Sequence, residues 1–232
     1  MPRLIIISNR LPVTVNRKQG ELIFYPSAGG LATGLNSLDE SIDKTWIGWP
    51  GEALDDEWER ESVKRDLARD HMVPVFLSEE DIELYYEGFS NKVIWPHFHY
   101  FTQFTSYEDK YWDAYQKVNE QFAKVVVENI QADDLIWVHD YQLLLLPALI
   151  RKSFPDISIG FFLHIPFPSY EIFRMLPWRE ALLMGMLGAD QIGFHTFGYM
   201  RHFLSAAYRI AGYEHYFGRL TVGRRVINVD VF

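Results

Sequence analysis

The sequence predicts an α/β protein with a Rossmann-like, mostly parallel sheet and helices on both of its faces. Short runs of bulky apolar residues recur along the chain, as expected for strands that are buried on both faces of a sheet. Longer amphipathic or charged segments separate these runs, and such alternation of strand and helix is typical of a parallel sheet. The clearest strands lie at residues 3–8 and at the beginnings of 135–147 and 157–169.

The other elements follow in chain order. Alternating residues at 13–25, with a turn near Gln19–Gly20, predict a hairpin. Ser78 precedes a run of three acidic residues, which is a signature of a helix N-terminus. The remaining predictions are a helix over 30–38, a strand over 45–49, a surface helix over 55–70, a strand over 73–77, a long amphipathic helix over 107–130 and a last strand within 224–232.

Composition narrows the class of protein. The 232 residues, 48% of them hydrophobic, suffice for one domain over 1–232, and no linker divides them. A net charge of −9 argues against nucleic acid as a partner, because a basic face is needed to neutralise phosphates. The absence of cysteine excludes disulfides, Cys-ligated zinc and thiol nucleophiles. No apolar run is long enough for a signal peptide or a bilayer span, so we expect a cytoplasmic protein without a membrane partner.

Two of the apolar runs end in ionisable side chains. His139, Asp140 and Tyr141 follow the first, and His164 follows the second. Ligands of open α/β sheets bind beyond the carboxyl ends of the strands, so these residues outline a candidate site. The alternative is that Asp140 caps the next helix and that His164 is a hydrogen-bonded core histidine.

Arg10 and a glycine-rich segment add a possible anion site. Arg10 lies at the carboxyl end of the first strand, where a guanidinium can bind a phosphate with two hydrogen bonds. The segment SAGGLATGL (27–35) places glycines at the start of a predicted helix, and the backbone there can approach a phosphate or sugar. It matches neither dinucleotide-binding nor P-loop spacing. A surface arginine, and glycines that only permit close helix packing, are the alternatives.

An aromatic segment at 85–100 mixes Tyr and Trp with polar residues. Such side chains suit a sugar, with an apolar face for the ring and a polar tip for hydroxyls, although they also suit a protein core. His97 and His99 lack the spacing of a metal site. Asp140 has no second carboxylate placed for glycoside hydrolysis, so group transfer is favoured over hydrolysis.

Seven segments together resemble the trehalose-6-phosphate synthase family, glycosyltransferase family 20. They occur in the order of that family between residues 8 and 204: SNRLP (8–12), SAGGLATGL (27–35), TWIGWPG (45–51), YYEGFSNKVIWPHFHY (85–100), WVHDYQLLLLP (137–147), GFFLHIPFPSYEIFRMLP (160–177) and DQIGFHTFGYMRHFL (190–204). Among these segments, the motifs WVHDY and FFLHIPFP at this spacing are highly specific for the family.

The resemblance implies a retaining glycosyltransferase of the GT-B type, in which two Rossmann-like domains face each other across a cleft. Members transfer glucose from UDP-glucose to glucose 6-phosphate, giving trehalose 6-phosphate and UDP, and use no metal or other cofactor. This chain is expected to be the N-terminal, acceptor-binding half, with little activity alone and with a possible homo-oligomer in the full-length protein. The donor nucleotide is read by the C-terminal domain of the family.

The resemblance also implies roles for individual residues. Asp140 and His164 are the expected catalytic residues. The acceptor is expected to contact Arg10, Tyr86, Trp95, Asp140 and Trp49 (or Trp46 in place of Trp49), and the donor to contact Gly29, Gly30 and His164. Trp95 and Ile165 are expected to influence the choice of anomer. Two alternatives stay open: a pseudo-glycosyltransferase of the same fold, and a non-catalytic module that binds sugar phosphates.

Overall fold

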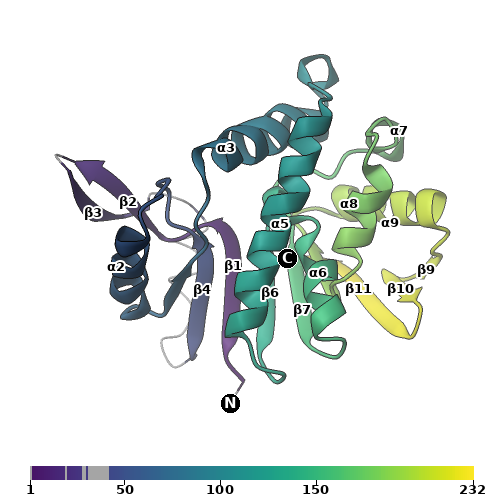
Figure 1. The fold of residues 1–232 in the computed structure, drawn as a ribbon. Helices are drawn as coiled ribbons and strands as arrows, with labels where there is room; N and C mark the ends of the chain where they lie inside the picture. Colours follow the sequence, from purple (N-terminus) through teal and green to yellow (C-terminus); the bar gives the residue numbers. More distant parts are fainter. Residues whose placement is uncertain (1, 19, 28–29, 31–41) are drawn as a thin grey trace.

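A computed structural model describes residues 2–18, 20–27, 30 and 42–232, and it confirms the predicted α/β fold (Figure 1). Nine strands form one sheet in the order β5-β4-β1-β6-β7-β8-β11-β10-β9. The strands of this sheet are β1 (Leu4–Arg10), β4 (Lys44–Trp49), β5 (Met72–Pro74), β6 (Leu135–His139), β7 (Ser158–Phe162), β8 (Gln191–Phe194), β9 (His215–Tyr216), β10 (Arg219–Val222) and β11 (Arg225–Val231). The predicted hairpin is also present, as β2 (Val13–Lys18) and β3 (Glu21–Pro26).

The strand order reverses at β1, the third strand from one edge of the sheet. Both of its neighbours, β4 and β6, run parallel to it, as do the pairs β4–β5, β6–β7, β7–β8 and β8–β11. The chain adds β4 and β5 on one side of β1 and then crosses to β6 on the other side. Side chains at the carboxyl ends of β1 and β6 therefore border the crevice in which α/β sheets bind ligands. Within this sheet, β9 and β10 depart from the parallel pattern of the described strands, as an antiparallel extension of β11.

Helical segments connect the strands and cover the sheet. They are α2 (Glu57–Ala68), α3 (Glu79–Asp81), the π-helix η1 (Ile82–Ile94), α4 (Trp95–Phe98), the 3-10 turns η2 (Thr102–Phe104) and η3 (Tyr141–Leu143), α5 (Asp109–Asn129), α6 (Leu146–Ser153), α7 (Tyr170–Phe173), α8 (Arg179–Met186) and α9 (Phe197–Ala211). None of the described helices is long and apolar enough to span a bilayer.

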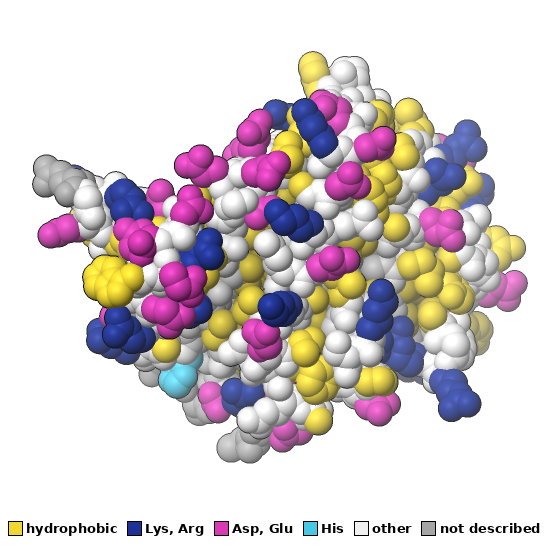
Figure 2. All heavy atoms as spheres, viewed as in Figure 1, with side chains coloured by type: hydrophobic (Ala, Val, Ile, Leu, Met, Phe, Trp, Pro, Cys, Tyr) yellow, Lys and Arg dark blue, Asp and Glu magenta, His cyan; other side chains and the backbone are white. Residues whose placement is uncertain are grey.

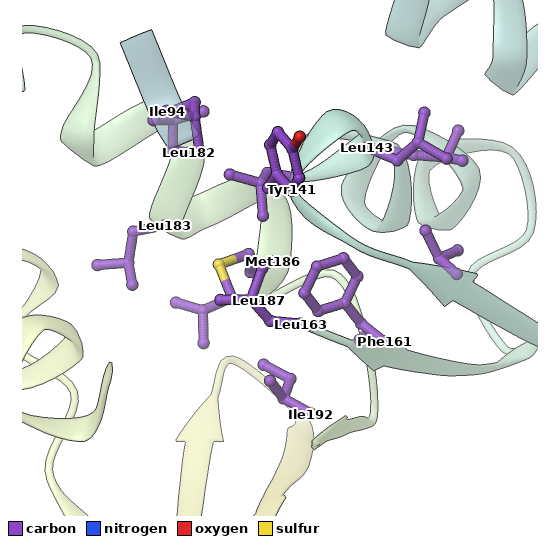
Figure 3. Packing of buried hydrophobic residues seen from close by; sticks show 14 of the residues in the cluster. Ile94, Tyr141, Leu143, Phe161, Leu163, Leu182, Leu183, Met186, Leu187 and Ile192 are labelled. Atoms are coloured by element: carbon purple, nitrogen blue, oxygen red, sulfur yellow. The ribbon is translucent and has the colours of Figure 1, made fainter. Parts of the chain in front are cut away.

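The larger core lies between the sheet and α5, α6, α8 and α9. Leu163, which follows β7, lies beside Met186 and Leu187 at the end of α8, and Ile192 of β8 packs below them (Figure 3). A second cluster lies on the opposite face, where Ile6 and Trp46 meet Val63 and Leu67 of α2. Both faces of the sheet are thus covered, as the sequence predicts.

The long helix α5 illustrates how the sequence gives this packing. Tyr115, Val118, Phe122 and Val126 recur at helical spacing, and all four are fully buried in the larger core. The remaining face of the helix is polar, which places it in front of the sheet with one side in solvent (Figure 1). On the face of the molecule shown in Figure 2, acidic and basic side chains are interspersed, with apolar side chains exposed between them.

Most element predictions are confirmed, with three differences. The strand predicted over 73–77 is shorter and begins one residue earlier, as Met72–Pro74, although the N–H of Val75 still donates to the carbonyl of Gly48 on β4. The helix predicted to begin at Ser78 is present, with Ser78 and Asp81 forming a capping box, but after one turn it becomes the thirteen-residue π-helix η1. The helix predicted over 30–38 lies outside the described residues, apart from Gly30.

Candidate functional site

The carboxyl end of β1 carries a compact cation–aromatic cluster made of Arg10, Trp49 and Tyr86. The guanidinium carbon of Arg10 lies 4.5 Å from the ring centroid of Trp49, which ends the neighbouring strand β4. The Tyr86 ring, from η1, meets the Trp49 ring edge-on with centroids 5.9 Å apart. Three elements distant in sequence thus bring together three of the predicted acceptor residues.

The Arg10 guanidinium is half-buried and has no carboxylate partner among the described residues. Its Nη2 donates a hydrogen bond of 3.2 Å to the Thr14 hydroxyl, which is in turn 2.8 Å from the hydroxyl of Ser27 at the start of the glycine-rich segment. Burial lowers the pKa of Arg10, and nearby Tyr86 offsets this only in part. A partly desolvated cation without a counter-charge is suited to bind an anionic ligand.

Gly51 makes room for this guanidinium. A Cβ atom on Gly51 would lie 2.5 Å from Nη2 of Arg10 and 2.8 Å from its guanidinium carbon, closer than any van der Waals contact allows. Gly51 also has a φ of +102°, a conformation that other residues rarely adopt. The absence of a side chain at Gly51 is therefore part of how Arg10 is positioned.

Asp140 has the most unusual backbone of the candidate site. Directly after β6 it adopts φ 75° and ψ 174°, a region of conformational space that is essentially restricted to glycine. Its N–H donates to the carbonyl of Phe162 on β7, and its Oδ1 accepts a hydrogen bond of 3.2 Å from the N–H of His164. The carboxylate therefore joins the ends of β6 and β7. Asp140 is the N-cap residue of η3, but it lacks the usual side-chain capping bond, and its carboxylate instead bridges to His164, which follows β7 by two residues.

Side chains of α5 form hydrogen bonds to the backbone of the residues that follow Asp140. The buried hydroxyl of Tyr115 donates to the carbonyl of Tyr141 and accepts from the N–H of Leu144. Asn119 Nδ2 donates to the carbonyl of Gln142. These bonds satisfy backbone groups on the far side of Asp140, and surrounding structure of this kind is what allows a strained conformation to persist.

Burial raises the pKa of Asp140 to about 6, although hydrogen bonds from the N–H groups of Tyr141 and His164 act in the opposite direction. We therefore expect the Asp140 carboxyl to titrate near pH 6 in the ligand-free protein. Carboxyl ¹³C NMR measures this directly, and Asp140→Asn identifies the signal because it removes it. A midpoint near the ordinary value of 3.8 would contradict the burial that the structure gives this carboxyl.

Three histidines follow one another along the carboxyl ends of β6, β7 and β8. His139 Nδ1 lies 3.0 Å from Nε2 of His164, and the His164 and His195 rings have centroids 5.7 Å apart. Burial lowers the pKa of His139 to about 3 and that of His164 to about 4, so both are neutral at pH 7. His164 is half-buried and hydrogen-bonded, as the core alternative requires, and it follows the carboxyl end of β7 by two residues.

The π-helix η1 is fastened to both strand ends that carry the site. The fully buried Tyr85 donates a hydrogen bond of 2.9 Å to Oδ1 of Asn9, the residue before Arg10. Tyr141, the residue after Asp140, donates a bond of 3.0 Å to Oδ1 of Asn91. Long π-helical segments are rare and occur frequently at functional sites. Here the two bonds fix Tyr86 relative to Arg10 and to the Asp140 turn.

The other predicted site residues either lie apart from the cluster of Arg10 or are buried in the core. Trp95 is 42% exposed and stacks on His99, with centroids 4.2 Å apart, and no hydrogen bond or ring contact joins it to the cluster of Arg10 within the described part of the chain. Ile165 is buried in the core beside His164. Trp46 lies in the second core cluster and donates to the Ser8 hydroxyl, so Trp49 is the tryptophan that reaches Arg10.

The glycine predictions are only partly covered by the described residues. Gly29 lies outside them, and Gly30 is exposed with open space around its Cα. Sequence reasoning did not anticipate the supporting residues Asn9, Tyr85 and Tyr115. Each is a buried polar residue that bonds across a large sequence separation, and nothing in the local pattern distinguishes it from an ordinary core residue.

A family profile, curated relatives and solved structures show which known proteins this chain is similar to. Residues 2–232 match the profile of Glycosyltransferase family 20. The chain is 44% identical to an alpha,alpha-trehalose-phosphate synthase [UDP-forming] A of Dictyostelium discoideum, over 99% of this chain and 31% of the relative. Among solved structures it resembles the N-terminal domain of a Candida albicans trehalose-6-phosphate phosphatase, with a TM-score of 0.83, 31% identity, and coverage of 100% of this chain and 48% of the other.

A further solved structure carries a ligand. It is an alpha,alpha-trehalose-phosphate synthase (UDP-forming) from Burkholderia xenovorans in complex with glucose-6-phosphate, with a TM-score of 0.80, 30% identity, and coverage of 99% of this chain and 49% of the other. The chain thus spans about a third of the Dictyostelium relative and about half of the two solved chains. Because the family profile covers almost every residue, the chain belongs to glycosyltransferase family 20.

Proposed function

We propose that these residues form the acceptor-binding domain of a retaining, UDP-forming trehalose-phosphate synthase, which transfers glucose from UDP-glucose to glucose 6-phosphate. The observation that carries the proposal is the half-buried Arg10, which has an aromatic wall and no carboxylate partner among the described residues, at the reversal point of the sheet. The relatives' names give the reaction class, and the Burkholderia complex contains the proposed acceptor.

In this proposal the acceptor lies along the carboxyl ends of β1 and β6. Arg10 binds the phosphate, with the Tyr86 hydroxyl beside it, while Trp49 supports the guanidinium from below. The Asp140 carboxylate accepts hydrogen bonds from acceptor hydroxyls next to the new bond. Trp95 contributes an exposed aromatic face at the rim, and with Ile165 it influences the choice of anomer.

The donor is proposed to lie over β7, with its glucose against His164 and its diphosphate near the backbone of Gly29 and Gly30. Retention without an enzymic nucleophile requires the acceptor hydroxyl and the leaving phosphate to lie on one face of the sugar. The departing diphosphate then takes the proton of the acceptor hydroxyl. The protein's contribution is to hold both substrates in that geometry and to stabilise the developing charge.

Calorimetric titration of glucose 6-phosphate tests the acceptor site. We expect Arg10→Ala to weaken binding by about 1.5–3 kcal/mol, the contribution of a hydrogen bond to a charged group, which is roughly tenfold to a hundredfold in Kd. Gly51→Ala is expected to act in the same direction, because its Cβ displaces the guanidinium. Arg17→Ala is the matched control, since Arg17 is exposed on β2 and paired with Glu59.

Titration with glucose, which lacks the phosphate, tests whether Arg10 contributes to binding of the phosphate or of the sugar. It is expected to bind equally weakly to the unsubstituted protein and to Arg10→Ala. If Arg10→Ala and Arg17→Ala bind glucose 6-phosphate with the same affinity, then Arg10 is not the phosphate ligand and the proposed acceptor site is wrong.

A second candidate is a non-catalytic module that binds sugar phosphates. The similarity to the N-terminal domain of a trehalose-6-phosphate phosphatase is the observation that favours it. Product analysis distinguishes the two: a transferase that contains these residues forms a phosphorylated disaccharide from UDP-glucose and glucose 6-phosphate, whereas a binding module only retains the sugar phosphate.

A further inference from the structure

His139 is a buried ionisable residue at the crevice to which the proposed reaction gives no role. It is the last residue of β6 and is only 1% exposed. Its Nδ1 lies 3.0 Å from Nε2 of His164, and its own Nε2 is buried without a hydrogen-bond partner among the described residues. The Trp137 ring packs against the other side of its imidazole, with centroids 4.6 Å apart.

The contact decides which nitrogen of His164 is available to a ligand. A neutral imidazole has one N–H and one lone pair. The bond to His139 occupies Nε2 of His164, and Nδ1 has no partner within the described part of the chain and is not among its fully buried atoms. A ligand in the crevice therefore meets His164 through Nδ1.

The buried Nε2 of His139, which has no partner among the described residues, indicates which nitrogen atoms of His139 and His164 carry protons. If His164 donated to His139, then His139 would keep an N–H on Nε2, buried and without an acceptor. If His139 donates instead, that nitrogen carries only a lone pair. Buried N–H groups without a partner are rarer in proteins than acceptors without one. The arrangement with Nδ1–H on His139 and Nδ1–H on His164 is therefore favoured.

We propose that His139 is a positioning residue: through its Nδ1–H it fixes the ring and tautomer of His164, so that His164 offers an N–H to an oxygen of the donor sugar. The second half of this statement rests on the proposed function, and the first half does not. Besides His139, the groups that face His164 are the Phe162 ring, the His195 ring and the Asp140 carboxylate, which binds its backbone N–H.

Imidazole ¹⁵N NMR of the ligand-free protein tests the positioning. We expect a scalar coupling between Nδ1 of His139 and Nε2 of His164 across the hydrogen bond. The chemical shifts are expected to identify both Nδ1 atoms as protonated. Absence of the coupling, or a proton on Nε2 of His164, overturns the proposal. This measurement requires no variant and no substrate, so it remains decisive if a substitution at the buried His139 prevents folding.

Variants then separate positioning from general packing. His139→Leu is expected to give His164 a mixture of tautomers, whereas His139→Asn, whose amide can donate from near the position of Nδ1, is expected to restore a single one. His202→Leu is the control: it removes an imidazole that bonds the carbonyl of Phe167 on a different element, and the coupling is expected to persist. A single unchanged tautomer of His164 in His139→Leu overturns the proposal.

Kinetics of an active transferase that contains these residues test the consequence. We expect His139→Leu to raise KM for UDP-glucose at least tenfold while KM for glucose 6-phosphate stays unchanged, and His139→Asn to recover most of the loss. The double variant with His164→Leu is expected to lose no more than His164→Leu alone, because the two residues act as one unit. Additive losses overturn the inference. Absence of any transfer in the unsubstituted enzyme refutes the proposed function and leaves the NMR result standing.

Discussion

Replacement of Asp140 by glycine is expected to make the protein more stable and, under the proposed function, to abolish glucose transfer by an enzyme that contains these residues. The backbone of Asp140 is held at φ 75° and ψ 174°, where a residue with a side chain is strained by about 1–3 kcal/mol. Glycine adopts this conformation freely, at the cost of about 0.5–1 kcal/mol of chain entropy. The substitution also removes a carboxylate whose pKa burial raises to about 6.

The part of this gain in stability that comes from removing the buried carboxylate depends on pH. A carboxyl with a raised pKa favours the folded state when it is protonated, and this contribution is lost as the pH rises from about 4 through about 6. The advantage of Asp140→Gly is therefore expected to be largest above pH 6. Below pH 4 only the relief of backbone strain remains. Loss of the hydrogen bond from the His164 N–H to this carboxyl offsets part of these gains, so we expect a net gain of about 1–3 kcal/mol at pH 7.

Urea unfolding at pH 7 and pH 4, beside a transfer assay, tests this expectation. Asp140→Ala is the matched control, because it removes the carboxylate but keeps a Cβ in the strained conformation. It is expected to lose activity to the same extent and to gain less stability than Asp140→Gly. If Asp140→Gly is less stable than Asp140→Ala, then the backbone of Asp140 is not strained as the structure indicates.

Gly188→Ala is expected to destabilise the fold more than any substitution at the candidate site. Gly188 follows α8 at the point where this helix crosses α6, and an added Cβ would overlap the backbone of Pro147 and Ala148. Backbone atoms cannot move aside as a side chain can, so the two helices would have to separate. The Gly188 carbonyl also accepts hydrogen bonds from Arg151 and Arg225, which tie β11 to the end of α8. We expect a loss of about 3 kcal/mol or more.

Thermal and urea unfolding measure this loss, and Gly198→Ala supplies the comparison. Gly198 lies in the first turn of α9, and the nearest atom to its added Cβ is the Thr196 hydroxyl at an ordinary 3.6 Å. Alanine is the better helix former, so Gly198→Ala is expected to be neutral or stabilising. Equal stability of the two variants would mean that α6 and α8 are not in close contact at Gly188.

The fold and the individual site residues follow from sequence because their signals are local. Apolar runs that end in Arg10, Asp140 and His164 predict both buried strands and the edge at which those side chains meet. Helical periodicity likewise predicts α5 to within two residues at either end. The resemblance of the motifs to one family adds the expected roles, and the structure then shows that Arg10, Trp49 and Tyr86 lie together.

Other features depend on contacts between distant residues and have no local signal. Nothing in the segment after Ser78 predicts that its helix becomes π-helical, and the residues to which that helix bonds, at the end of β1 and in the Asp140 turn, are distant in sequence. The strain of Asp140 is equally invisible in a sequence, since aspartate there looks like a helix cap. Likewise, choosing Trp49 over Trp46 requires knowledge of which face of β4 each side chain occupies.

The two hydrogen bonds that attach η1 to the end of β1 and to the Asp140 turn set the spacing between the two ends of the candidate site. One bond sets Tyr86 against the end of β1 and the other sets the same rigid segment against the turn of Asp140, so the spacing between Arg10 and Asp140 is fixed by the core. Under the proposed function, an acceptor is selected by the distance between its phosphate and its reacting hydroxyl. A sugar phosphate in which this distance differs can contact Arg10 or Asp140, but not both at once.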